Sequence, residues 1–425
     1  MTDHQFLEKI FSKQPSQILL GLDRMQAAYE FLGSPSSTIP VMLIGGTNGK
    51  GSTAAVASIA LSNKGFRVGL YTSPHLLSFA ERMAVSDHKT TMDELISIYA
   101  VLEAKLQPLN WDQLTFFEAT TLLALSYFEA KSCDILVIEV GLGGRLDATN
   151  ILSPLVSIVT SIDLDHMEWL GPTLEHIAKE KLGIARPHRP LLLGEGFSVH
   201  GLDHLAEATG AQIHHALRQR APSALAPWIE TRGDTFSANA RLGLQGTELM
   251  LKAMGLPSKA DGELGSFLPP SLAGRTTEIL FDESSLFCDI SHNPAGIKAL
   301  KFEFVRRYGA KRVPVFVSVL RDKDVGGILD EFASFHEPLV FFRTASPRSI
   351  KSKSELSSLW GGQIEWYDSF QDLWNIWSVR LSGRGSAIIG GSFTAVAAAM
   401  EFFGAKDIYD IDFPTMEFKS FWRQS

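Results

Sequence analysis

The segment Gly45–Ser52 reads GGTNGKGS and combines glycines, a lysine and hydroxyl side chains. It follows an apolar run, Val41–Ile44, and leads into the helix-favouring stretch Thr53–Ala60. Glycines let backbone N–H groups face a phosphate, a helix N-terminus adds partial positive charge, and a lysine reaches the outer phosphates. This spacing therefore predicts a loop that binds a nucleoside triphosphate.

The loop departs from the usual G-x-x-x-x-G-K-[ST] pattern. Ile44 stands where the first glycine falls, Gly51 follows the lysine, and Ser52 comes one position late. Switch GTPases and motor ATPases keep the standard spacing, so the departure points away from both. A glycine-rich turn without a ligand is the alternative, although few structural turns need Gly-Lys-Gly-Ser after a strand. A dehydrogenase is excluded because no G-x-G-x-x-G follows the first strand.

Two polar positions after predicted strands suit a metal that accompanies phosphates. Glu139 is the first charge after an apolar strand, where a carboxylate suits Mg²⁺ and a turn-capping carboxylate is the alternative. His166 follows Asp163 and Asp165 beyond a later strand. An imidazole is a less usual magnesium ligand, so its spacing leaves a metal role and a hydrogen-bonding role equally open.

Lys181 lies on the apolar face of a predicted helix that begins after Pro172 and Thr173. From Leu174 onward, apolar residues recur at helical spacing, and Lys181 is the seventh residue after Leu174 on that face. An inward lysine is costly unless it is paired or chemically altered. Snorkelling at the helix end is the alternative. The functional interpretation is a lysine aimed at the site.

The segment Thr115–Glu118 opens another strongly apolar helix. Aromatic residues at helical spacing usually belong to the core, and stacking on a flat ligand is the less common role. A charged segment of the second half, Asp322–Asp324, is interpreted as a solvated loop.

Composition limits the class of protein. The 425 residues are 45% hydrophobic and 20% charged with a net charge of -8, which is typical of a globular protein and argues against a nucleic-acid partner. Cys133 and Cys288 lie far apart and form no metal motif. The N-terminal stretch lacks a signal-peptide core, and no apolar run approaches the roughly 20 residues of a membrane helix. We therefore expect a cytoplasmic protein without a membrane partner.

Apolar strands alternate with helices from residue 40 onward, which predicts an α/β fold with a parallel sheet covered on both faces. The first predicted strands are Val41–Ile44, Val68–Tyr71, Ile135–Val140 and Val156–Ile162, and the main helices between them are Glu94–Leu106 and Phe116–Ala130. Alternation stops at Ser258–Gly274, a proline- and glycine-containing linker, and then resumes. We therefore predict an ATP-binding domain at residues 1–270 and a smaller α/β domain at residues 271–425.

Several motifs, in order, resemble the folylpolyglutamate synthase/dihydrofolate synthase family of Mur-ligase-like ATP-dependent amide ligases. The run Glu139–Asn150 is the most specific of them. The others include Leu20–Arg24, Gly46–Ser52, Thr72–Leu76, Glu81–Arg82, Phe117–Glu118, Asp165–His166, Trp169–Gly171, Glu180–Lys181, Gly274–Arg275, His292–Pro294, Asp322–Asp324 and Gly391–Phe393. The resemblance implies a P-loop domain that binds ATP and pterin, followed by a Rossmann-like C-terminal ligase domain.

The resemblance also implies roles for individual residues. ATP would be bound by Asn48, Gly49, Lys50, Gly51, Ser52, Arg275 and Asp289, and Mg²⁺ by Ser73, Glu139 and His166. The pterin site would be lined by Thr115, Phe116, Phe117, Glu118, Leu146, Asp147 and Ala148. Phe117 would stack on the pterin ring, and Asp147 would form hydrogen bonds with the edge of the ring. Lys50, His166 and Lys181 would be catalytic, Lys181 as a carbamate formed with CO₂, and His292 joins the set without an assigned role.

The sequence departs from the family pattern in three places. Counting back from Gly255–Leu256 puts Gly243 where an Asn-Ala pair usually opens a helix, and Asn239-Ala240 lies four residues early. Thr276 stands where an apolar residue is usual, and Ser291 replaces a commoner small residue. None of these changes removes a phosphate or metal residue.

The expected activity is ATP-dependent ligation of L-glutamate to a pterin carboxylate through an acyl phosphate, in folate biosynthesis and one-carbon metabolism. The substrate is dihydropteroate, tetrahydrofolate or both, and the expected form is a monomer. The alternatives are a cell-wall Mur ligase, which the Phe117 and Asp147 segments disfavour, and an ATP-binding protein without ligase activity.

Overall fold

The computed structural model describes residues 1–13, 21–109, 111–195, 197, 199–218, 229, 233–257, 272–281, 284–334, 338–381, 386–405 and 415–417. The chain divides into two compact units. Unit 1 comprises Met1–His75 and Phe79–Ser271, and unit 2 comprises Leu76–Ser78 and Leu272–Ser425. Residues 258–271 of the expected linker lie outside the described residues.

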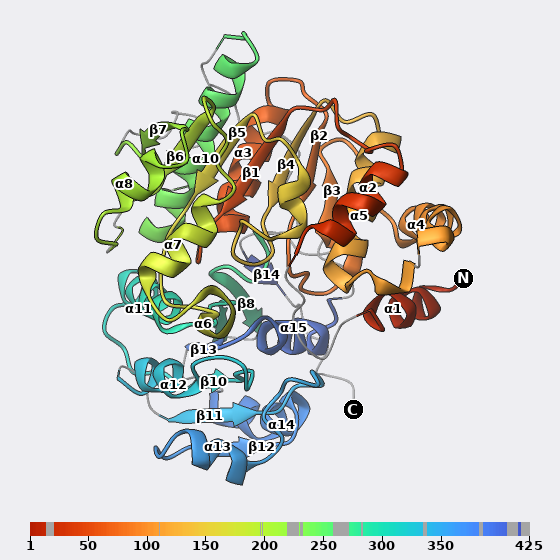
Figure 1. Ribbon diagram of the computed structural model, residues 1–425. Coiled ribbons are helices and arrows are strands. Elements are labelled where there is room, and N and C mark those ends of the chain that lie inside the picture. The colour runs from red at the N-terminus through yellow and green to blue at the C-terminus, as the bar shows by residue number, and fades with distance from the viewer. Residues whose placement is uncertain are drawn as a thin grey trace. The chain divides into compact units, whose positions relative to one another are not determined.

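Unit 1 is built on a seven-stranded sheet with the order β3-β2-β4-β1-β5-β6-β7 (Figure 1). Its strands are β1 (Val41–Gly45), β2 (Val68–Tyr71), β3 (Met83–Val85), β4 (Ile135–Glu139), β5 (Val156–Val159), β6 (Pro190–Leu193) and β7 (Gln212–His215). All neighbours are parallel except β2 and β3, which pair antiparallel. The predicted parallel sheet is confirmed, with one antiparallel pair at this edge, because residues 72–82 are too few for the helical crossover that parallel pairing needs.

Helices cover both faces of this sheet. They are α1 (Asp3–Phe11), α2 (Asp23–Phe31), α3 (Lys50–Ser62), α4 (Met92–Leu106), α5 (Phe116–Ala130), α6 (Met167–Leu170), α7 (Leu174–Leu182), α8 (Leu202–Glu207) and α10 (Asp234–Ala253). Short 3₁₀ turns span η1 (Phe79–Arg82), η2 (Gln107–Leu109), η3 (Trp111–Gln113) and η4 (Ala148–Ile151).

Each central strand contributes side chains to two cores. Along β1, Val41 and Leu43 join the cluster that contains α4 and α5, whereas Met42 and Ile44 join the cluster beneath α3 and α10. Neighbouring side chains alternate because a strand has a two-residue repeat. The prediction of strands buried on both faces is confirmed.

Unit 2 has its own seven-stranded sheet with the order β12-β11-β10-β13-β9-β8-β14. Its strands are β8 (Thr277–Phe281), β9 (Ser284–Cys288), β10 (Val315–Val317), β11 (Leu339–Phe342), β12 (Glu365–Tyr367), β13 (Ser386–Gly390) and β14 (Thr415–Glu417). Its helices are α11 (Pro294–Tyr308), α12 (Val325–Ala333), α13 (Lys353–Leu359), α14 (Phe370–Leu381) and α15 (Phe393–Phe402). Pairing is parallel except between β8 and β9, which again makes the sheet mixed.

Along the described part of the chain, no helix is both long enough and apolar enough to cross a lipid bilayer.

Close packing between α3 and α10 generates a stability prediction. A Cβ at Gly243 would lie 2.7 Å from the Thr53 carbonyl oxygen and 3.0 Å from the Ala57 nitrogen. We expect Gly243→Ala to force these helices apart and to lower the free energy of unfolding by about 1–3 kcal/mol, as overpacking does. Urea denaturation measures this change.

The matched control is Gly326→Ala in α12, where the nearest atom to an added Cβ is the Leu359 carbonyl oxygen at 3.7 Å. This change should be neutral or slightly stabilising, because alanine favours helices more than glycine does. Equal effects from the two substitutions would contradict the packing argument.

Candidate functional site

The glycine-rich loop lies at the carboxyl end of β1 and follows a path that favours glycine. Gly46 and Gly49 have φ values of +141° and +85°, in the region that side chains disfavour. A Cβ at Gly46 would also overlap the Thr160 hydroxyl. Helix α3 begins at Lys50, and among the described residues no side chain caps its N-terminus at Gly49. Such an N-terminus is suited to an anion.

Hydrogen bonds hold this loop to the segment after β5. The Thr160 hydroxyl donates to the Asn48 carbonyl oxygen at 2.6 Å, and the Asn48 amide donates to the Ser161 hydroxyl at 2.9 Å. The Lys50 ammonium donates to the carbonyl oxygens of Gly46 and Thr47 at 2.9 and 3.1 Å. Lys50 therefore lies over the loop that the sequence predicted to bind phosphates.

Asn239 lies beside the glycine-rich loop, although its position is four residues earlier than the family pattern predicts. A Cβ at Gly49 would overlap the Asn239 side-chain amide, and the Thr53 hydroxyl donates to the Asn239 carbonyl oxygen at 3.2 Å. Gly243 lies one helical turn further along α10, against the body of α3. Counting back from Gly255 therefore indicated the wrong residue. Of Asn239 and Gly243, Asn239 is the one that contacts the loop.

The structure brings together two of the three predicted metal ligands. Glu139 ends β4, is only 3% exposed, and accepts a hydrogen bond from the Ser73 amide at 3.0 Å. His166 lies at the N-terminus of α6 in a left-handed conformation (φ +51°), with Nε2 3.8 Å from an Asp165 carboxylate oxygen. Within the described ranges, no three His, Cys, Asp or Glu side chains are close enough to enclose a metal.

Lys181 is buried on α7, as its place on the apolar face predicted. Lys181 is only 3% exposed to solvent. Burial, reinforced by the positive charge of Lys50, lowers the pKa of Lys181 to about 7, while the carboxylates of Asp165 and Asp163 oppose this shift. The electrostatic effect of Lys50 indicates that both lysines belong to one region of unit 1. Near neutral pH, Lys181 is therefore more readily an uncharged amine than an exposed lysine is.

The predicted pterin segment begins α5 with a capping box. The Thr115 hydroxyl accepts from the Glu118 amide, and the Glu118 carboxylate accepts from the Thr115 amide at 2.7 Å. Phe116 is buried and stacks on Phe11, with ring centroids 5.1 Å apart. Phe117 is only partly buried, so it is the more accessible ring of the two for a ligand.

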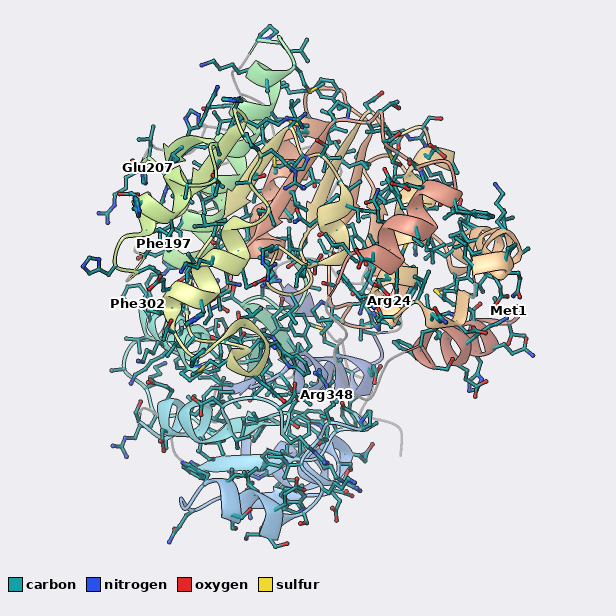
Figure 2. The ribbon with its side chains drawn as sticks, viewed as in Figure 1. Met1, Arg24, Phe197, Glu207, Phe302 and Arg348 are labelled. Atoms are coloured by element: carbon teal, nitrogen blue, oxygen red, sulfur yellow. The ribbon has the colours of Figure 1, made fainter. Side chains whose placement is uncertain are left out.

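Arg24 is a neighbour of this segment that sequence reasoning missed. Its guanidinium pairs with the second Glu118 oxygen at 3.1 Å, and Figure 2 labels its place in unit 1. The motif Leu20–Arg24 contains Arg24, but no local sequence pattern predicts a contact between residues 94 positions apart.

Asp147 uses both carboxylate oxygens within its own loop. Oδ1 accepts from the amide and hydroxyl of Thr149, and Oδ2 accepts from the Leu142 amide at 2.8 Å. Burial raises the pKa of Asp147, and these hydrogen bonds oppose that rise. Asp147 also caps the η4 turn that begins at Ala148, so its carboxylate has a structural role beside the ligand role that the resemblance implies. Leu146, the residue before it, is partly buried.

Similarity to characterised proteins decides the family. A family model of the Mur ligase middle domain matches residues 44–192. The dihydrofolate synthase/folylpolyglutamate synthase of Escherichia coli (strain K12) is 30% identical over 421 residues, which cover 94% of each chain. This chain belongs to the dihydrofolate synthase/folylpolyglutamate synthase family. Its Mycobacterium tuberculosis relative is 29% identical over 368 residues, covering 77% of this chain and 75% of the relative.

Solved structures of this family share the fold over nearly the whole chain. E. coli FolC in complex with DHPP and ADP has a TM-score of 0.79 at 28% identity, covering 95% of this chain and 97% of that one. A bifunctional folylpolyglutamate synthase/dihydrofolate synthase with Mn, AMPPNP and L-glutamate bound has a TM-score of 0.79 at 27% identity, covering 95% and 98%. These matches favour this family over a cell-wall Mur ligase.

In unit 2, the predicted nucleotide residue Asp289 is held by two residues that depart from the family pattern. Its carboxylate accepts from the Thr276 amide at 2.9 Å and from the amide and hydroxyl of Ser291. Burial raises the pKa of Asp289, and these bonds and the charge of Arg275 oppose the rise. The nearby His292 ring lies 3.1 Å from the Ile290 carbonyl oxygen. Thr276 and Ser291 therefore support the aspartate rather than disrupt it.

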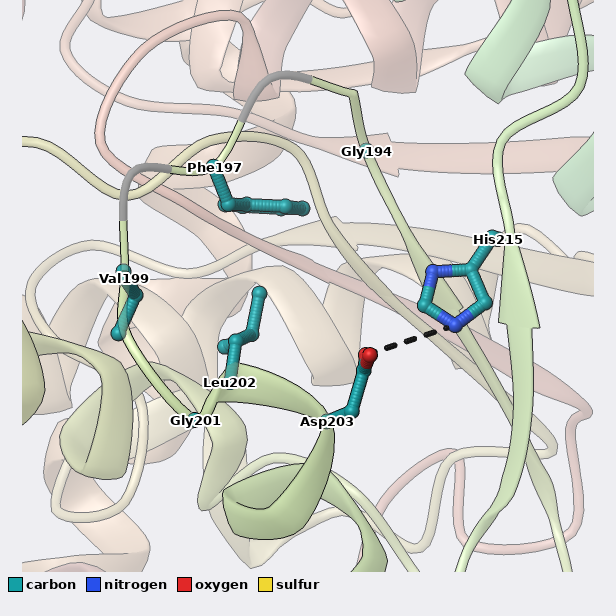
Figure 3. Close-up of a pocket in the computed structure, with 7 residues that line it drawn as sticks. All are labelled: Gly194, Phe197, Val199, Gly201, Leu202, Asp203 and His215. Atoms are coloured by element: carbon teal, nitrogen blue, oxygen red, sulfur yellow. Dashed lines mark ion pairs between the residues drawn. The ribbon is translucent and has the colours of Figure 1, made fainter.

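A separate pocket of unit 1 lies at the ends of β6 and β7 and contains no predicted site residue (Figure 3). It is lined by Gly194, Phe197, Val199, Gly201, Leu202, Asp203 and His215. Asp203 and His215 form an ion pair of 3.6 Å, but both side chains are more than half exposed, so the pair contributes little stability.

The pKa of Lys181 predicts how stability changes with pH. It is about 7 in the folded protein and 10.5 for an ordinary lysine, so between these values the unfolded chain holds a proton that the folded protein lacks. Wild-type stability therefore rises with pH across this window. We expect the stability gained by Lys181→Met over wild type to be largest at and below about pH 7 and to shrink as the pH rises toward the ordinary lysine pKa of 10.5.

Urea denaturation at several pH values measures this difference. Lys179→Met is the control, because the Lys179 side chain is 57% exposed on the same helix. A Lys181→Met difference that stayed constant with pH would rule out the proposed linkage.

Proposed function

We propose that this chain joins L-glutamate to the carboxylate of a pterin-bearing substrate, using ATP. The γ-phosphoryl group moves to the substrate carboxylate and forms an acyl phosphate. The amino group of glutamate then attacks the acyl carbon, and phosphate leaves. Family membership over nearly the full chain is the observation that carries the proposal, and the loop that holds Lys50 at the end of β1 gives it a structural basis.

The substrate classes follow from the relatives. The E. coli structure contains DHPP and ADP, and a second family structure contains Mn, AMPPNP and L-glutamate. We extend these classes to the present chain: ATP with a divalent cation, glutamate, and a pterin carboxylate such as dihydropteroate or a reduced folate. A monomeric state and a cytoplasmic location stay predictions.

Lys50 and the start of α3 bind the phosphates in this proposal. A lysine and preorganised backbone dipoles are worth most where charge develops in a phosphoryl-transfer transition state. Asn48, Gly49, Gly51 and Ser52 complete the loop, while Arg275 and Asp289 in unit 2 keep their predicted role in nucleotide binding. Phe117 stacks on the pterin, and the segments Thr115–Glu118 and Leu146–Ala148 surround it.

Ser73, Glu139 and His166 are proposed to hold Mg²⁺. Glu139 suits this role because it is a buried carboxylate next to Ser73, and a hard cation prefers such oxygen ligands. The small protein donor set fits a magnesium ion that keeps waters and nucleotide phosphates as its other ligands. When bound, the ion supplies charge neutralisation at the phosphates.

Lys181 is proposed to react with CO₂. The neutral amine nitrogen bonds to the carbon of CO₂, one N–H proton is released to solvent, and a carbamate anion remains. A pKa of about 7 favours this step because only the uncharged amine is nucleophilic. The carbamate would place a negative charge near Asp163 and Asp165, in the region that Lys50 also influences.

Removing Lys50 tests the function. We expect Lys50→Ala to lower glutamate-dependent phosphate release by roughly 100-fold or more, because a charge that stabilises the transition state is lost. The assay offers dihydropteroate and tetrahydrofolate side by side, which also separates the two substrates. Lys64→Ala is the control, because Lys64 is exposed in the turn that follows α3.

Three outcomes of this assay are informative. Release that requires glutamate and falls only in the Lys50 variant supports the ligase. ATP hydrolysis that ignores glutamate supports the alternative of an ATP-binding protein without ligase activity. Wild-type-like release by Lys50→Ala would refute the role of the loop.

Removing Lys181 tests the carbamate. We expect Lys181→Ala to lose activity by roughly 100-fold and to recover part of it with formate or acetate, whose carboxylate can replace the missing anion. Sodium chloride at equal ionic strength is the control. Absence of rescue, together with wild-type activity that is indifferent to removal of CO₂, would argue against the carbamate.

A further inference from the structure

Arg82 and His75 form a hydrogen-bonded pair in unit 1 that has no role in the reaction described above. Arg82 ends the η1 turn and is 6% exposed. Its Nε–H donates to the His75 Nδ1 at 2.8 Å. Both residues belong to motifs of the family resemblance, Thr72–Leu76 and Glu81–Arg82, in which only Ser73 has an expected function.

Arg82 is a buried cation without a paired anion in the described part of the chain. Among the described residues, Glu81 and Glu139 act on Arg82 as nearby charges without forming an ion pair with it, and the one hydrogen bond of its guanidinium goes to the neutral acceptor of His75. Its guanidinium carbon lies 5.8 Å from the Phe79 ring centroid and 5.2 Å from that of Phe116. Rings of this kind attract a cation weakly but do not neutralise it. A buried charge of this sort is costly unless an anion pairs with it.

The neighbours of Arg82 include residues of the predicted pterin segment and of the predicted metal site. Phe116 is part of the predicted pterin segment, and Glu139 is a predicted metal ligand that acts electrostatically on Arg82. Tyr71 also interacts electrostatically with Arg82, and its ring centroid lies 5.9 Å from that of Phe117. Arg82 therefore lies in the region between the pterin segment and the phosphate end of the site.

His75 orients the guanidinium and remains uncharged. Because Nδ1 accepts the bond from Arg82, the ring carries its proton on Nε2. The bond to His75 uses only Nε of Arg82, so its two terminal amino groups can donate to another acceptor. The planar guanidinium can form two parallel hydrogen bonds with the two oxygens of a carboxylate.

We propose that Arg82, oriented by His75, binds the carboxylate of the pterin-bearing substrate. The inference rests on the proposed function and deepens it, because it names the group that recognises the reacting end of the substrate. Arg82 is thereby a specificity residue for a pterin that bears a carboxylate.

Equilibrium binding without ATP tests the assignment. The probes are dihydropteroate and its analogue that lacks the carboxylate. A charge-assisted bidentate contact should make wild-type protein bind dihydropteroate roughly 10- to 100-fold more tightly than the analogue. In Arg82→Met this ratio should approach one, and in Arg82→Lys, which keeps the buried charge, it should be intermediate.

The ratio separates recognition from structure, because a merely structural loss weakens both ligands equally. Thermal melting identifies folded variants, and Arg82→Lys is informative if Arg82→Met does not fold. Arg307→Met is the control, since Arg307 also lies over a phenylalanine ring but already pairs with Glu303.

A wild-type protein that binds both probes equally, or a folded Arg82→Met variant that keeps the full preference, would overturn the assignment while leaving the ligase proposal intact. A wild-type protein that binds neither probe would overturn both the substrate class and the role of Arg82.

Discussion

The glycine-rich loop of unit 1 depends on hydrogen bonds between the loop after β1 and the segment after β5. Thr160 and Ser161 bond to Asn48, and this contact holds the loop on its glycine-dependent path. The donors of the loop are consequently oriented before a ligand binds, which is the condition for electrostatic catalysis. Because α3 starts inside the loop, the same hydrogen bonds set the direction of α3. Helix α3 packs against α10, and this packing places Asn239 beside the loop.

Local signals in the sequence predicted the parts of the fold that depend on neighbours along the chain. The helix Phe116–Ala130 was predicted with its observed ends, since Thr115 and Glu118 close a capping box at its start. The burial of Lys181 followed from a helical repeat of apolar residues. Strand β5 ends at Val159, before the predicted Ile162, because the next residues bond to the glycine-rich loop instead of a neighbouring strand.

Contacts between distant segments could not be predicted in this way. Arg24 meets Glu118, and Asn239 meets Gly49, through the packing of elements that are far apart in sequence. Counting along one helix failed for Asn239, since the distance from a helix end says nothing about which turn lies against a neighbouring loop. The antiparallel edge strand β3 was missed for a similar reason, because its direction depends on the length of its connection.

The left-handed path at Gly46, together with the Thr160 hydroxyl beside it, leaves no room for a side chain. Every missense change of this codon introduces at least one carbon where none fits. Purifying selection at this position would therefore act on the shape of the main chain, independently of which nucleotide, metal or pterin a given descendant of the enzyme uses.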